Sequence, residues 1–259
     1  MNRPKIKDGT YHDSYAFRGC LEARISGGIF TGQYVFYSAK SPKISGGEFK
    51  SDFSFYAAEN PLVYGGIFSG KMSFYGTISP VIHNGNFDGN WIFCESQGAL
   101  IKAGRFSCSG ALSEAVRANV HGGLFNGSDF GITSRQMVIT GGNFTGPGLL
   151  KYSQNALVLG GEISGTASFE RAQNIRVLLN DTIPEICNPL SGIIAAKNIG
   201  RIVFDKEKPS DVIIIAETVG EGAPYADLIN VGCIPGSPLD KNQAINILQD
   251  MTTLIHSRY

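Results

Sequence analysis

The chain has 259 residues, and its 22 basic residues balance 22 acidic residues to a formal net charge of zero. This neutrality argues against a groove that tracks the phosphates of a nucleic acid and against an acidic DNA mimic, while it leaves room for local charged patches. The 33 glycines, together with many β-branched and aromatic residues, disfavour a helical chain.

The N-terminal residues and the cysteines indicate the cellular compartment in which the protein is expected. The residues after Met1 are polar, and no apolar run of about 18 residues occurs, so we expect a cytoplasmic protein of the producing or host cell that does not enter a membrane. The five cysteines show no CxxC spacing. We therefore expect reduced, mostly buried thiols, and no disulfide framework, metal site or cofactor.

A 19-residue repeat organises the chain from Ile6 to Arg176, in nine consecutive copies without insertion. The copy from Ile25 to Lys43 reads ISGGIFTGQYVFYSAKSPK, and its opening isoleucine defines the first position of the repeat. The third position admits Asp8, Asn84 and Ala103. The fourth position is glycine in every copy: Gly9, Gly28, Gly47, Gly66, Gly85, Gly104, Gly123, Gly142 and Gly161.

This repeat predicts an all-β fold, a parallel β-helix (β-solenoid) with 19-residue coils, because each short unit buries its apolar face only by stacking on the next. The invariant glycine predicts a backbone with positive φ or a close approach that a Cβ would block. The first and sixth positions are expected inside. Their residues are Ile6, Ile25, Ile44, Val63, Ile82, Ile101, Val120, Ile139 and Val158, and Tyr11, Phe30, Phe49, Phe68, Phe87, Phe106, Phe125, Phe144 and Ile163.

The second half of the repeat carries a further apolar column at its twelfth position, from Phe17 to Phe169, and a small residue three positions later that suits an inward corner. The column is broken at Gly131, where Phe130 sits one position early, and this predicts a local bulge. Strand alternation predicts that the tenth position, with Tyr15, Tyr34, Phe53, Met72 and Trp91, also faces inward. The same alternation predicts that the thirteenth position faces outward, with Tyr37, Tyr56 and Tyr75.

The repeat divides the chain into three parts. Residues 1–176 form the nine-coil solenoid, and residues 177–238 are expected to continue the stack as longer, irregular coils, because the sequence around Asn174 has an echo around Asn198. Residues 239–259 are expected to form a C-terminal capping helix, since apolar residues between Leu239 and Ile255 fall on one helical face. Nothing in the sequence covers the N-terminal end, which predicts a homo-oligomer formed through that end.

The candidate binding residues are Tyr37, Tyr56 and Tyr75, because an exposed aromatic stripe can bind a glycan, a peptide or a protein. Stacking that only stabilises the rod is the alternative interpretation. Glu95 and Glu114 share a column at about 5 Å, the separation of a glycosidase pair, but solvated surface charges explain them better. His83 and His121 are two coils apart, too far to share a metal ion. No catalytic residue stands out.

The recurring IxGGxFxG with its 19-residue period resembles the right-handed parallel β-helix class over about two thirds of the chain. That class includes polysaccharide lyases and hydrolases, phage tail-fibre domains and polymerising scaffolds. The catalytic Asp clusters of its pectin-degrading members have no counterpart in these columns. The resemblance therefore implies a fold rather than an activity.

The leading hypothesis is a non-enzymatic binding or scaffold protein that uses solenoid faces or its N-terminal end to bind a macromolecular protein partner, such as a bacterial or phage intracellular inhibitor or adaptor. A carbohydrate-active β-helix enzyme or a glycan-binding fibre domain is the first alternative. A structural protein that polymerises end to end is the second.

Overall fold

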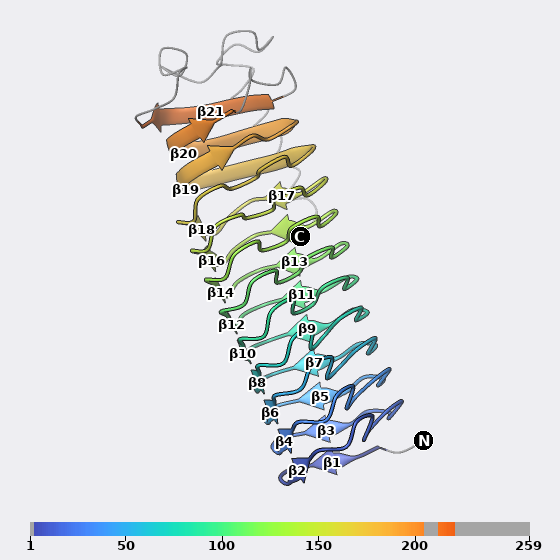
Figure 1. The fold of residues 1–259 in the computed structure, drawn as a ribbon. Coiled ribbons are helices and arrows are strands. Elements are labelled where there is room, and N and C mark those ends of the chain that lie inside the picture. Colours follow the sequence, from blue (N-terminus) through green and yellow to red (C-terminus); the bar gives the residue numbers. More distant parts are fainter. Residues whose placement is uncertain (1–2, 205–211, 221–259) are drawn as a thin grey trace.

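The computed structural model describes residues 3–204 and 212–220. Within these residues the protein is all-β and contains no helix, and its coils stack into one rod along which two parallel sheets run (Figure 1). The helix expected within residues 239–259 lies outside the described residues. The prediction of a parallel β-solenoid is confirmed.

The first sheet has 12 strands, and all but its last three are two residues long. In spatial order they are β1 (Lys5–Ile6), β3 (Arg24–Ile25), β5 (Lys43–Ile44), β7 (Leu62–Val63), β9 (Val81–Ile82), β11 (Leu100–Ile101), β13 (Asn119–Val120), β15 (Val138–Ile139), β17 (Leu157–Val158), β19 (Ile175–Cys187), β20 (Gly192–Val203) and β21 (Val212–Val219).

The second sheet has nine strands of two residues each. They are β2 (Thr10–Tyr11), β4 (Ile29–Phe30), β6 (Glu48–Phe49), β8 (Ile67–Phe68), β10 (Asn86–Phe87), β12 (Arg105–Phe106), β14 (Leu124–Phe125), β16 (Asn143–Phe144) and β18 (Glu162–Ile163). Ile6 pairs with Ile25 and Phe30 with Phe49, so equivalent positions of successive repeats lie side by side, as predicted.

The core consists of side chains stacked in columns along the axis. Phe30, Phe49 and Phe68 are fully buried, and successive ring centroids lie 4.7 Å apart with nearly parallel planes. The twelfth-position phenylalanines form a second ladder, in which Phe55 and Phe74 stack at 4.8 Å. Stacked aromatic pairs add about 0.5–1.5 kcal/mol to the transfer energy of burial. The columns predicted to lie inside at the first, sixth and twelfth positions are confirmed.

The invariant glycines have the backbone that the sequence predicted. Their φ values run from +96° at Gly9 to +145° at Gly85, in a region that residues with a Cβ rarely adopt. A Cβ on Gly85 would stand 3.0 Å from the ring of Phe87. Glycine therefore serves two needs here, a left-handed backbone and room for the buried aromatic ladder.

The second half of each coil is built from turns rather than strands. The amide of Tyr37 donates to the carbonyl of Tyr34, and the amide of Ala39 donates to that of Phe36, which closes two overlapping turns. The tenth-position residues have left-handed φ values, for example +55° at Tyr34 and +60° at Trp91. Because alternation holds only in strands, these residues point outward, and their predicted inward placement is wrong.

Phe130 lies inside, as predicted, but without the predicted bulge: it occupies the eleventh repeat position, which is also buried at Ala111 and Leu149 in the neighbouring coils. The amide of Gly131 donates to the carbonyl of Ala111 just as that of Leu112 donates to that of Ile92, so the register is unchanged. Phe130 is 4 % exposed and packs between Phe125 and Phe144 at centroid distances of 4.5 and 5.1 Å, while Gly131 turns with a φ of +66°. The small residues of the inward corner are also buried: Cys20, Ala39, Ala58, Thr77, Ser96, Ala115, Ser134, Ser153 and Ala172.

The chain after Arg176 continues the first sheet with longer strands, but the sequence echo between Asn174 and Asn198 does not set their register. Ile175 pairs with Gly192, and Gly192 pairs in turn with Val212. Asn198 pairs with Thr182 instead of lying beside the segment around Asn174. Strand β19 also contains a register shift between Leu179 and Thr182. The two similar segments are therefore not structurally equivalent.

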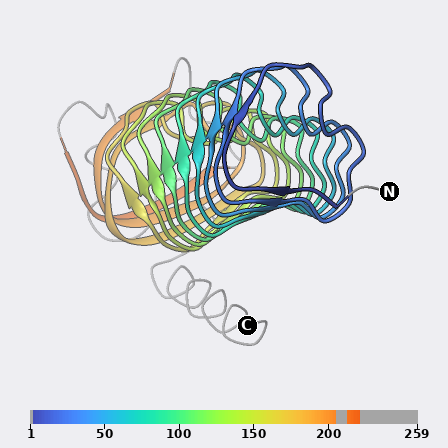
Figure 2. The same ribbon diagram turned by 90° about the horizontal axis from the view of Figure 1, so that it is seen from below.

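The two sheets end at β1 and β2 in the N-terminal coil. Figure 2 shows this coil in front of the stack, with the later coils repeating its outline behind it. Tyr11 stacks on Phe30, and Phe17 stacks on Phe36, while each packs only partly buried against the core. The aromatic ladders thus reach the open end of the rod in the described part of the chain.

Candidate binding surface

Aromatic side chains gather on one outer corner of the solenoid, which we call the aromatic corner. It comprises two columns of side chains, one from the tenth and one from the thirteenth repeat position of successive coils. Tyr15 is 45 % exposed and Trp91 is 39 % exposed, and the other rings are half-buried against one another. The members are Tyr15, Tyr34, Phe53 and Trp91 in the first column, and Tyr37, Tyr56 and Tyr75 in the second.

The rings of consecutive coils stack face to face, except that Met72 separates Trp91 from Phe53 in the first column. Tyr15 lies on Tyr34 at 5.2 Å and Tyr34 on Phe53 at 5.0 Å between centroids, with interplanar angles of 5° and 7°. Tyr37, Tyr56 and Tyr75 stack in the same way at 5.5 and 5.2 Å. The faces of the inner rings are thus occupied by their neighbours, and mainly ring edges and hydroxyl groups are left to meet a ligand.

The two columns also contact each other, edge to face. Tyr34 meets Tyr56 at 5.7 Å and Phe53 meets Tyr56 at 5.9 Å, with interplanar angles of 69° and 62°. A ring that touches neighbours above, below and beside it has little rotamer freedom left to lose. The corner is therefore a pre-ordered surface, which lowers the entropic cost of binding.

Charged side chains contact the aromatic corner at both of its ends along the rod. The guanidinium of Arg18 lies 5.2 Å from the ring centre of Tyr37 and 5.8 Å from that of Tyr15. At the other end the hydroxyl of Tyr75 donates to the carboxylate of Glu95, and this hydrogen bond is the main cause that raises the pKa of Tyr75.

The sequence predicted only half of this surface. It placed Tyr37, Tyr56 and Tyr75 on the outside, where they lie, but it missed the tenth-position column. The sequence did contain a signal for the turn at the tenth position, because the later coils have Gly110, Asp129 and Gly148 there. Glycine and aspartate are among the residues that tolerate a left-handed backbone best, so they marked a turn where alternation does not apply.

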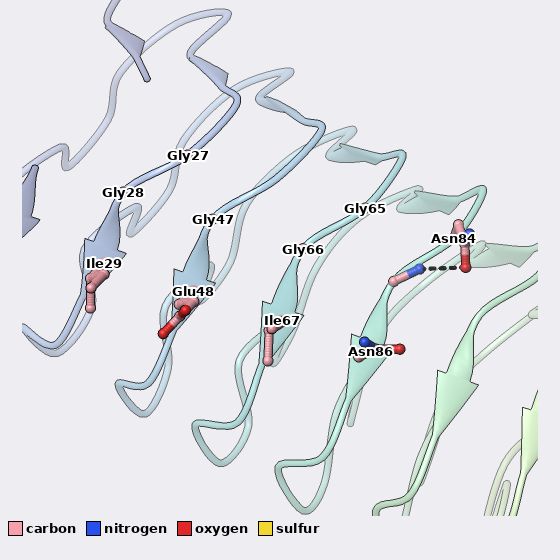
Figure 3. A pocket seen from close by; sticks show the side chains of 11 residues that line it. Gly27, Gly28, Ile29, Gly47, Glu48, Gly65, Gly66, Ile67, Asn84 and Asn86 are labelled. Atoms are coloured by element: carbon pink, nitrogen blue, oxygen red, sulfur yellow. Dashed lines mark hydrogen bonds between the residues drawn. The ribbon is translucent and has the colours of Figure 1, made fainter. Parts of the chain in front are cut away.

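A shallow groove of about 540 Å³ runs between the two sheets over the N-terminal coils (Figure 3). Its floor is glycine, since a Cβ on Gly27 would stand 2.0 Å from the carbonyl oxygen of Lys7. Its wall changes chemistry from coil to coil: Ile29, Glu48, Ile67 and Asn86. Such a wall offers no repeated contact to a polymer, so the groove is a weaker candidate than the corner.

The ionisable residues considered for catalysis, Glu95 and Glu114, and for metal binding, His83 and His121, lie at the surface. Glu95 and Glu114 are exposed neighbours on successive coils, as expected of solvated charges. His83 stacks on Tyr64 at 4.6 Å, whereas His121 makes a hydrogen bond to Thr140. Over the described ranges, no group of three His, Cys, Asp or Glu side chains could hold a metal ion.

Three cysteines are buried, as the sequence suggested: Cys20, Cys94 and Cys108. Burial raises the pKa of the Cys20 thiol to about 11 and those of Cys94 and Cys108 to about 12. No helix of sufficient length and apolarity to cross a membrane occurs among the residues that the structure describes.

The chain matches no curated protein and no solved structure. A family model, described as Protein of unknown function (DUF3737), matches residues 77–215, which is more than half of the 259 residues. The matched segment holds Trp91 and Glu95 but not the rest of the aromatic corner, so the comparison bears on the later coils of the solenoid. The chain belongs to the DUF3737 family.

Proposed function

We propose that this protein is a non-enzymatic, cytoplasmic binding protein whose aromatic corner is the contact surface for a protein partner. The single observation that carries the proposal is the collection of seven aromatic side chains on one outer corner: Tyr15, Tyr34, Tyr37, Phe53, Tyr56, Tyr75 and Trp91. Tyrosine and tryptophan dominate the binding energy of protein interfaces, since they combine a large apolar area with a polar group. An adaptor or an inhibitor would use such a surface.

The stacking geometry favours a protein over a glycan. A sugar binds aromatic residues by lying flat on an open ring face, and the inner rings Tyr34 and Tyr56 have neighbours on both faces. Ring edges and hydroxyl groups suit the mixed apolar and hydrogen-bonding contacts of a protein interface. The glycan-binding and carbohydrate-active alternatives therefore become outcomes of the test.

The test is quantitative affinity capture from the native host with three forms of the protein. The Tyr15→Ser/Trp91→Ser variant removes the two most exposed rings of the corner. The matched control Ile67→Ser/Leu124→Ser removes two apolar side chains of similar exposure, 42 % and 50 %, from the second sheet. Thermal melting confirms that all forms are folded.

The proposal expects a protein that the wild type and the control retain and the corner variant loses. A partner captured equally by all three forms would exclude the corner as the contact surface. Binding of the wild type to a glycan array, abolished by the corner variant, would replace the protein partner with a sugar.

A second candidate function is self-association through the N-terminal end, as a dimer or an end-to-end assembly. The supporting observation is that β1 and β2 lie last in their sheets, so in the described part of the chain one edge of each has no strand partner. Exposed edges of this kind pair readily with further strands. Light scattering over a concentration series tests it, with Thr10→Pro to block the β2 edge. A wild type that stays monomeric at high concentration would contradict it.

A further inference from the structure

One column on the outer face of the 12-stranded sheet changes chemistry halfway along its first six residues, before it continues through Asn119, Val138 and Leu157. Lys5 pairs with Arg24 and Arg24 with Lys43, and the same register continues into Leu62, Val81 and Leu100. We call these six residues the amphipathic column. The three basic residues are exposed, and the three aliphatic residues are half-buried.

The basic half of the column forms a pocket of about 650 Å³. Lys7 adds a fourth cation beside it, and the rest of the lining contains no carboxylate: Ile6, Ile25, Ser26, Ser45 and Tyr64. Among the described residues none of the four cations forms an ion pair, whereas nearby Arg3 pairs with Glu22 at 3.3 Å. In a chain of zero net charge, four neighbouring unpaired cations point to an anionic ligand.

The spacing of the column points to a helix. Neighbouring strands lie about 4.8 Å apart, so the six residues form a row at this interval. Residues three and four apart on an α-helix are separated by about 4.5 and 6.0 Å along its axis, which brackets the interval. An extended peptide repeats its side chains on one face at about 6.8 Å and does not match.

The aliphatic half decides the class of ligand. Leu62, Val81 and Leu100 continue the row of cations on the same face, next to the stacked pair Tyr64 and His83. A nucleic acid strand would place phosphates along the whole row and gain nothing from aliphatic side chains. A protein segment can supply carboxylates for one half and apolar side chains for the other.

We propose that the amphipathic column docks a helix of a partner protein, with Asp or Glu residues against Lys5, Arg24 and Lys43 and apolar residues against Leu62, Val81 and Leu100. The row spans about 24 Å, which corresponds to a helix of about 16 residues. This surface lies on a different part of each coil from the aromatic corner, and the proposal does not depend on the function proposed for the corner.

The test measures binding of a labelled probe peptide to the full chain by fluorescence anisotropy. The probe is an alanine-based helix of about 18 residues, with three Glu followed by three Leu at alternating spacings of three and four. Lys5→Ser/Arg24→Ser/Lys43→Ser removes the basic half, and Leu62→Ser/Leu100→Ser disrupts the aliphatic half. The control Lys71→Ser/Arg105→Ser/Arg117→Ser removes three exposed cations elsewhere, so that the net charge changes equally.

We expect the basic-half variant to weaken probe binding about tenfold or more at low salt, and the control to change it less than about twofold. The aliphatic variant should also weaken it. An equal loss in the basic-half variant and the control would overturn the proposal, as would the absence of probe binding to the wild type. Tighter binding of single-stranded oligodeoxythymidylate than of the probe would overturn it too, because the patch would then be a phosphate site.

Discussion

The indole of Trp91 lies directly against the backbone of Gly110 in the next coil, where a Cβ would stand 2.8 Å from ring atom Cε3. Both residues occupy the tenth position of the repeat, and both have left-handed φ values, +60° and +70°. The first column of the corner, in which Met72 follows the stacked rings, therefore ends on a tryptophan that rests on a glycine.

Gly110→Ala should displace the Trp91 ring, because the added methyl group occupies its place. We expect a loss of about 1–2 kcal/mol in the free energy of unfolding and a shift in tryptophan emission, which reports on Trp91 alone because the chain has one tryptophan. Gly76→Ala is the matched control, with a φ of +61° and nothing within 4 Å of its Cβ position. Equal effects of both substitutions would show that the backbone alone matters.

The aromatic ladder should be most sensitive to truncation inside the stack. Phe74→Ala removes a fully buried ring that stacks on Phe55 and Phe93, and we expect a loss of about 3–5 kcal/mol in denaturant unfolding. Phe17→Ala in the same column removes a ring that is only partly buried at the end of the stack, so its cost should be less than half as large. Similar costs at the two positions would contradict the ladder as the main source of stability.

The first half of each coil followed from the sequence, because two-residue strands flanked by glycines keep their side chains in strict alternation. Phe30 and Gly47 are examples: the first is buried and the second has a φ of +107°, as their columns predicted. Tyr34 and Trp91 did not follow the prediction, since a turn residue with left-handed φ points its side chain outward. The pairing of Ile175 with Gly192 could not be predicted, because the repeat no longer constrains the register there.

The buried serines should differ in how much each contributes to the stability of the fold. The hydroxyl of Ser113 donates to the carbonyl of Gly110 at 2.7 Å, whereas that of Ser134 is buried without a hydrogen-bond partner in the described structure. Ser113→Ala should therefore cost about 1 kcal/mol, and Ser134→Ala should be neutral or stabilising, because it removes an unsatisfied polar group. Denaturant midpoints measure both. A larger loss at Ser134 than at Ser113 would refute this assignment.

The buried cysteines should resist alkylation in the native protein. Burial raises the pKa of Cys94 and Cys108 from 9.0 to about 12, so at pH 8 both are thiols rather than reactive thiolates. We expect iodoacetamide to modify them only after unfolding, as shown by peptide mass spectrometry. Because the folded pKa lies above the unfolded value, the associated stability is present below about pH 9 and is lost as the pH rises from there toward 12. Rapid labelling of native Cys108 would contradict its burial.

The most direct test of the aromatic corner as a binding surface is ¹⁹F NMR of the protein labelled with 5-fluorotryptophan, which places one reporter at Trp91. On addition of the partner recovered by affinity capture, the account predicts that the single resonance shifts or broadens and saturates with the bound fraction. A partner that binds by an independent measurement and leaves this resonance unchanged would contradict it.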